Sequence, residues 1–163
     1  MPVPLADLPP VPPELIHDGE VPEKSLFFDT NCALHPDVPK AQQQGWRTLI
    51  SVIVYAELTT RVKGKKGLNA IDANLSDRRI QVVQFDASSA RCFFDLCRPL
   101  RFDAPPLMRH NEDERSCKDR LRFDLLVFAA ALRHRATLVT DNVRDFTHFP
   151  YPQYWKTRAD LLP

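Results

Sequence analysis

Residues 124–146 read DLLVFAAALRHRATLVTDNVRDF and combine two patterns of different period. Four apolar residues of the first half share one face of a predicted helix that runs to residue 135: Leu125, Phe128, Ala129 and Leu132. In the second half, residues 136–140 form a short apolar run of the kind found in buried strands, and this run ends at Asp141. The segment therefore predicts a helix, then a buried strand with a carboxylate at its end.

The same alternation of strands and helices extends toward the N-terminus. Predicted strands lie at residues 25–28, 48–51 and 80–83, and predicted helices at 52–62, 68–75 and 87–97. Gly64 follows the first of these helices, where a glycine suits the C-terminal cap. Because strands that alternate with helices are joined by crossovers, the pattern predicts an α/β fold with a parallel central sheet.

Two segments fall outside this alternation. Residues 1–24 contain seven of the fifteen prolines, which exclude a regular helix and favour extended backbone. Residues 101–118 mix both signs of charge without an apolar period, which is typical of a long surface loop. We therefore expect a proline-rich N-terminal arm at residues 1–24 and one folded domain at residues 25–163.

The composition is that of one ordinary domain. The chain has 163 residues, of which 44% are hydrophobic, enough for a single core. No run is long and apolar enough to span a membrane and the N-terminus lacks a signal-peptide pattern, so we expect a soluble, cytoplasmic protein. The net charge of +1 excludes a general attraction to nucleic acid. The four cysteines lack a CxxC pair and are interpreted as reduced, mostly buried thiols.

Acidic side chains are the strongest functional signal. Asp29 and Asp141 end predicted strands, Glu57 lies within a helix, and Asp124 begins one. In open α/β sheets ligands bind beyond the carboxyl ends of the strands, so we expect these acids to converge there. Carboxylates about 4 Å apart repel by roughly 4 kcal/mol at an effective dielectric near 20, and a divalent cation relieves that repulsion. Oxygen ligands without His or Cys suit Mg²⁺ or Mn²⁺, the ions of phosphoryl chemistry.

Each acid also has a purely structural interpretation. Asp29 and Asp124 can each cap the helix that follows them. Glu57 can pair with Arg61 one turn later. Asp141 and Asp145 fit a turn in which aspartate bonds its own backbone.

Cations lie beside two of the predicted helices. One group follows the 52–62 helix and is a candidate for RNA phosphate contacts, or for interaction with the helix dipole alone: Arg61, Lys63, Lys65 and Lys66. A second group borders the helix that begins near Asp124: Arg120, Arg122, Arg133, His134 and Arg135. Position alone makes this second group a set of candidate phosphate contacts, with ordinary solvated surface as the alternative.

Three segments together resemble the PIN-domain nucleases, and within them the VapC-type toxins of bacterial toxin-antitoxin pairs. They are residues 26–31 (LFFDTN), residues 50–58 (ISVIVYAEL) and residues 124–146, in the family's order. The resemblance implies a three-layer α/β/α fold with a mostly parallel sheet, spanning about residues 25 to 150. It further implies a metal-dependent ribonuclease, with a small antitoxin as partner and a homodimer as assembly.

The resemblance also implies roles for the acids. Asp29 and Asp124 correspond to metal ligands for Mg²⁺ or Mn²⁺, and Glu57 to a third catalytic carboxylate. The place of the family's fourth acid is held by Asn142, a candidate RNA contact, while Asp141 lies one residue before it and Asp145 three residues after it. Both aspartates are therefore candidate catalytic residues.

Two other functions compete with the nuclease. A haloacid-dehalogenase-like phosphatase would use the acid at the end of the first strand as nucleophile, but it needs a second aspartate where this chain has Asn31. A catalytically inert PIN-like module would bind RNA or a protein without turnover, and the retention of the principal acids argues against it.

Overall fold

The computed structural model describes residues 24–161 of the chain. The predicted arm, residues 1–24, lies outside the described residues except for Lys24. The strands are β1 (Ser25–Phe28), β2 (Arg47–Ser51), β3 (Gln81–Val83), β4 (Thr137–Val139) and β5 (Trp155–Lys156). The helices are α1 (Thr30–Ala33), α2 (Val38–Gln43), α3 (Val52–Thr60), α4 (Gly64–Asp77), α5 (Ala87–Cys97), α6 (Glu114–Arg133), α7 (Val143–Phe146) and α8 (Arg158–Leu161), with a 3-10 turn, η3 (Pro152–Tyr154), before β5.

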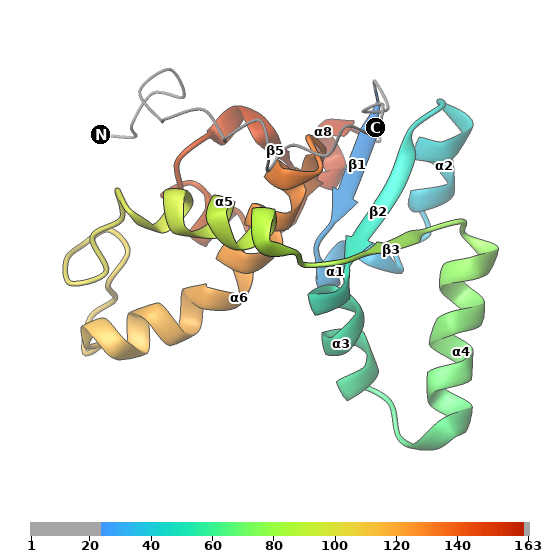
Figure 1. Ribbon diagram of the computed structural model, residues 1–163, viewed down its shortest axis with the longest axis horizontal. Helices are drawn as coiled ribbons and strands as arrows, with labels where there is room; N and C mark the ends of the chain where they lie inside the picture. The colour runs from blue at the N-terminus through green and yellow to red at the C-terminus, as the bar shows by residue number, and fades with distance from the viewer. Residues whose placement is uncertain (1–23, 162–163) are drawn as a thin grey trace.

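The strands form one five-stranded sheet in the order β3-β2-β1-β4-β5, in which every neighbouring pair is parallel. Helices flank this sheet, as Figure 1 shows. The predicted α/β fold with a parallel central sheet is therefore confirmed. The strand order reverses between β1 and β4, and in such sheets this switch point opens the crevice in which ligands bind.

Strand β1 lies in the middle of the sheet, between β2 and β4, and its side chains are buried on both faces. Leu26, Phe27 and Phe28 are fully buried, as expected for the middle strand of a sheet covered by helices. Phe27 pairs in register with Leu49 of β2 on one side and Leu138 of β4 on the other. This packing fixes the position of the residue that follows β1, which is Asp29.

Helix α6 begins much earlier than the sequence pattern predicts. Asp113 caps its N-terminus by accepting a hydrogen bond from the Ser116 N–H at 2.7 Å, so the predicted loop ends at residue 113 and not at 118. Cys117 and Leu121 continue the buried stripe that Leu125 was expected to begin. The first turns carry only these two apolar contacts, so their pattern was interpreted as a loop. The interpretation of Asp124 as a helix cap is therefore wrong, because Asp124 lies in the middle of α6.

Helices α3 and α4 form a hairpin that leaves the sheet at the end of β2 and extends away from it (Figure 1). Ser51 caps α3 by accepting a hydrogen bond from the Val54 N–H. The prediction that Gly64 caps α3 is wrong. Gly64 is the first residue of α4 and has a left-handed φ of 71°, which glycine adopts without strain. Within residues 24–161, no helix combines the length and the apolar character that a bilayer-spanning segment needs.

Candidate functional site

The site lies at the switch point, where β1 and β4 end side by side. Asp29 directly follows β1, and its backbone N–H donates to the Val139 carbonyl at 3.0 Å. One carboxylate oxygen of Asp29 accepts from the Thr30 N–H at 2.7 Å, and the other accepts from the Thr140 hydroxyl at 2.8 Å. Asp29 thus caps α1, as one interpretation predicted, and is buried at the carboxyl end of β1.

Glu57 reaches the same edge from α3. Its Oε2 accepts a hydrogen bond from the Thr30 hydroxyl, and Thr30 is the residue after Asp29. Its Oε1 pairs with Arg61 at 3.3 Å, one turn along the helix, so the predicted surface pair also forms. The Glu57 side chain is 35% exposed. Glu57 therefore connects the buried Asp29 region with solvent.

Asp124 and Asp145 join the site through Asn142. The Asn142 amide nitrogen donates to Asp124 Oδ2 at 2.7 Å and to Asp145 Oδ2 at 3.3 Å. Asp124 comes from the middle of α6 and Asp145 from α7, so one side chain links two helices. Asn142, predicted as an RNA contact, therefore lies within the group of acids.

A chain of hydrogen bonds links these carboxylates, because the Asn142 N–H donates to the hydroxyl of Thr140, which itself donates to Asp29. Burial, together with the charges of Asp29 and Asp145, raises the pKa of Asp124 to about 7. Burial also raises the pKa of Asp29, against the lowering effect of the hydrogen bonds from Thr140 and Thr30. The structure brings together four of the five predicted catalytic acids: Asp29, Glu57, Asp124 and Asp145.

Asp141 lies apart from this group. Its carboxylate accepts from the Arg158 side chain at 2.6 Å and from the Arg158 N–H at 3.3 Å. The acid that contributes to the pKa of Asp124 from this part of the chain is Asp145. Of the two candidates for the fourth acid, the structure places Asp145 beside Asp124 and Asp141 beside α8.

The chemistry of the group fits a hard divalent cation, since its ligand atoms are carboxylate oxygens, and the negative charges of its members help to raise the pKa values of Asp29 and Asp124. The side chains as they stand are nevertheless held by donors of the chain itself, chiefly Thr30, Thr140 and Asn142. Within residues 24–161, no group of three or more His, Cys, Asp or Glu side chains is placed to hold one ion. The predicted metal ligands are therefore of the chemical type that Mg²⁺ or Mn²⁺ prefers, but the side chains of residues 24–161 do not form a coordination site.

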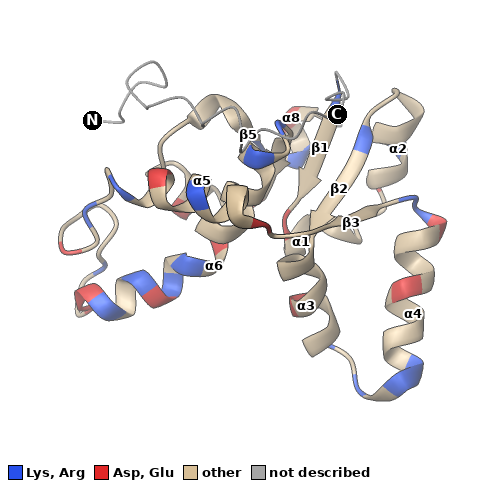
Figure 2. Cartoon of the chain, in the orientation of Figure 1, with Lys and Arg blue, Asp and Glu red and all other residues tan. Residues whose placement is uncertain are grey.

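The predicted cations divide between two regions. Lys and Arg residues gather at the turn between α3 and α4 (Figure 2), and the four predicted RNA contacts there are exposed: Arg61, Lys63, Lys65 and Lys66. By contrast, Arg133 pairs with Asp86 at 3.3 Å, and the His134 ring stacks on Phe27. Both residues lie at the C-terminal end of α6, just before β4 begins. This places them at the amino ends of the strands, opposite the end where the acids lie. Arg133 and His134 therefore lie away from the four acids, and their role as phosphate contacts stays a prediction.

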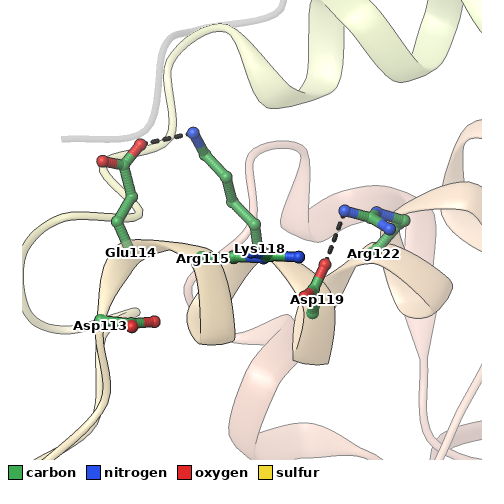
Figure 3. A pocket seen from close by; sticks show the side chains of 6 residues that line it. All are labelled: Asp113, Glu114, Arg115, Lys118, Asp119 and Arg122. Atoms are coloured by element: carbon green, nitrogen blue, oxygen red, sulfur yellow. Dashed lines mark hydrogen bonds and ion pairs between the residues drawn. The ribbon is translucent and has the colours of Figure 1, made fainter.

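One hollow in the described surface is lined by residues other than the four acids. It has a volume of about 650 Å³ and lies along the N-terminal half of α6 (Figure 3). Its lining is charged and largely self-paired, with Glu114 bound to Lys118 and Asp119 to Arg122. We assign no function to this hollow, since two of its three cations, Lys118 and Arg122, already have carboxylate partners.

Sequence reasoning missed two residues of the loop before α6: Arg109, which contacts Asp145 directly, and Glu112, which reaches it through Arg120. Arg109 pairs with Asp145 at 3.2 Å, and Glu112 accepts from Arg120 at 2.8 Å, while Arg120 also pairs with Asp145 at 2.9 Å. Nothing in the mixed charges of residues 101–113 distinguishes Arg109 from its neighbours. Arg120 carried a weak signal, because it precedes Asp124 by one helical turn and shares its face.

Comparison with known protein families finds none that matches the chain, and comparison with curated proteins likewise finds no match. Among solved structures, the chain resembles VapBC2 from Rickettsia felis, bound to a DNA fragment from its promoter, with 23% identity and a TM-score of 0.58. The likeness covers 82% of this chain and 98% of that one. The chain has a VapC-like PIN fold. VapBC-1 from nontypeable Haemophilus influenzae shares the same PIN fold, with 19% identity, a TM-score of 0.58 and coverage of 83% and 98%.

Proposed function

We propose that the chain is a metal-dependent ribonuclease, the VapC-like toxin of a toxin-antitoxin pair, that hydrolyses RNA phosphodiester bonds. The observation that carries the proposal is that Asp29, Glu57, Asp124 and Asp145 are linked by hydrogen bonds through shared neighbours at the switch point of a PIN-like sheet. A desolvated group of like charges is costly to a fold, and such groups are typical of functional sites. The VapC-like fold of the solved neighbours supports the same assignment.

In this proposal Asp29 and Asp124 would hold Mg²⁺ or Mn²⁺, with Glu57 as a third acid. The bound ion would polarise the scissile phosphate and lower the pKa of a water molecule. Thr140 and Thr30 orient the two oxygens of Asp29, and Thr30 also donates to Glu57. Asn142 keeps the carboxylate of Asp124 directed toward Asp145. These four acids and their donors provide placement and negative charge, and none of them acts as a covalent nucleophile.

The partners follow from the same proposal. Substrate RNA would approach along the exposed cations of the α3–α4 turn, where Arg61 contacts Glu57 and Lys63 lies two residues farther along. The solved neighbours are toxin-antitoxin complexes, so we also propose a small antitoxin partner and a homodimer. We place this activity in the cytoplasm, where its RNA substrate would be found.

The nuclease proposal is tested by metal removal. We expect the purified chain to cleave single-stranded RNA with Mn²⁺, to stop when EDTA is added and to resume when Mn²⁺ is restored in excess. Glu57→Gln should lose about tenfold or more in rate, since it removes one carboxylate charge from the site and keeps the side chain's size. Initial rates on a labelled oligonucleotide measure both effects.

Glu114→Gln is the matched control, because Glu114 pairs with Lys118 one turn later on α6 as Glu57 pairs with Arg61 on α3. It should cleave at the rate of the unchanged chain. Cleavage that persists in EDTA, or an equal loss in both variants, would reject the mechanism. RNA binding without cleavage under every metal condition would favour the inert module.

A further inference from the structure

Asp145 is saturated by donors of the chain. Its Oδ1 accepts from Arg120 Nη1 at 2.9 Å and from Arg109 Nη2 at 3.2 Å. Its Oδ2 accepts from Arg109 Nη2 at 3.4 Å and from the Asn142 amide at 3.3 Å. One carboxylate thus binds two guanidinium groups, one of which, that of Arg120, also pairs with Glu112. Asp145 is therefore an acceptor for arginine side chains and not a free carboxylate.

The two arginines differ in how completely they are used. All three guanidinium nitrogens of Arg120 are engaged, with Glu112 at 2.8 and 2.9 Å, with the Leu107 carbonyl at 2.7 Å and with Asp145. Its side chain is 20% exposed. This arginine ties the loop before α6 to the helix. Four of its five N–H groups are therefore used by oxygen acceptors within the chain.

Arg109 keeps donors available. Among residues 24–161, only its Nη2 has a side-chain partner, which is Asp145 at 3.2 and 3.4 Å, and the side chain is 38% exposed. Its backbone N–H donates to Glu112 at 2.9 Å, which fixes the loop while the guanidinium reaches Asp145. An ion pair this exposed contributes little stability, so the guanidinium can bind a second anion at small cost. The remaining N–H groups form the planar fork that suits phosphate.

We propose that Arg109 binds a phosphate of the RNA beside the cleavage site, and that Asp145 is the positioning residue that holds its guanidinium there. This inference rests on the proposed ribonuclease function. Arg61 contacts the acids through Glu57 and Arg109 contacts them through Asp145, so the two exposed arginines flank the group. A polyanion that approaches several carboxylates needs such cations on both sides. Arg109 adds a substrate contact that none of the sequence motifs contained.

The test measures RNA binding without turnover. A fluorescent single-stranded RNA oligonucleotide is titrated with the chain in EDTA at several salt concentrations, and anisotropy gives the affinity. We expect Arg109→Ala to weaken binding about fivefold and to reduce the slope of log affinity against log salt by about 0.7, the value for one lost phosphate contact on a single strand. Arg109→Lys should restore the slope, because it keeps the charge, but not the full affinity.

Arg101→Ala is the matched control. Arg101 lies in the same loop, is more exposed and pairs with Asp103 at 2.9 Å, away from the acids. It should leave both affinity and slope unchanged. An unchanged slope in Arg109→Ala together with a lower melting temperature would overturn the proposal, because Arg109 would then only fasten the loop.

The binding result also separates this inference from the function on which it rests. Cleavage by the unchanged chain with a normal salt slope in Arg109→Ala would overturn the inference alone. A reduced slope in Arg109→Ala without any metal-dependent cleavage would overturn the ribonuclease and support the phosphate contact. A chain that neither binds nor cleaves RNA would overturn both.

Discussion

Asp124→Asn is expected to reduce RNA cleavage by more than about 100-fold and, at the same time, to make the folded chain more stable. Loss of groups that only support metal ligands costs about 10- to 100-fold, and Asp124 is a proposed ligand itself. The asparagine keeps an oxygen that accepts from the Asn142 amide, so the local hydrogen bond survives. Initial rates with Mn²⁺ and thermal unfolding in EDTA measure the two effects.

The stability gain depends on pH in a defined direction. Burial and neighbouring acids raise the pKa of Asp124 from 3.8 to about 7. Between these values the unfolded chain releases its proton while the folded chain keeps it, so stability falls as pH rises through this window and stays low above it. The variant has no such proton. Its advantage in unfolding free energy should grow across the window to about 2–4 kcal/mol above pH 7.

Asp119→Asn is the control for both measurements. Asp119 lies on the same helix, is half exposed and pairs with Arg122. It should change neither the cleavage rate nor the shape of the stability curve. An Asp124→Asn protein whose stability follows pH as the unchanged chain does would contradict the burial of a charged carboxylate at this position.

Phe146→Ala is expected to cost about 3–5 kcal/mol of unfolding free energy, the largest loss of stability that we predict. Phe146 is fully buried and packs edge-on against Phe128 at 5.6 Å and Phe149 at 5.0 Å, with Trp155 of β5 at 5.8 Å. It is the residue after Asp145, so its loss should also loosen α7 and lower the cleavage rate. Urea unfolding followed by fluorescence measures the stability.

Val143→Ala is the control in the same short helix. Val143 is 41% exposed, and substitutions at such positions usually change stability by less than about 0.5 kcal/mol. A small effect of Phe146→Ala, equal to that of Val143→Ala, would show that α7 is not anchored by its aromatic neighbours.

The sequence predicted those parts of the fold in which burial is dense. Residues 87–97 were predicted as a helix with the same bounds as α5, and the strand at 25–28 matches β1. The helix that became α6 was missed over residues 114–123, where Cys117 and Leu121 are the only buried apolar residues and Phe123 is partly buried against the core. Strand β5 was not predicted because two residues, Trp155 and Lys156, leave no readable period.

The acids of the site were predictable because a carboxylate at the end of a buried strand, such as Asp29, is a local pattern. Their partners were not, because they depend on which loops fold back. Arg109 is 36 residues before Asp145. Asp141 is paired with Arg158 and Asp145 with Arg120, and these pairings decide which of the two aspartates lies with the other acids. No spacing in a single chain encodes those contacts.

The strand order also has a consequence for the nascent chain on the ribosome. β1 pairs with β4, and Asp29 is bound by Thr140, 111 residues later. During synthesis, β1 and β2 emerge first and can pair. The ribosome must add the whole of α6 and β4 before Asp124 and Thr140 can reach Asp29. A chain still in translation therefore carries Asp29 and Glu57 before Asp124 and Asp145 have been added, so the group of acids forms only late in synthesis.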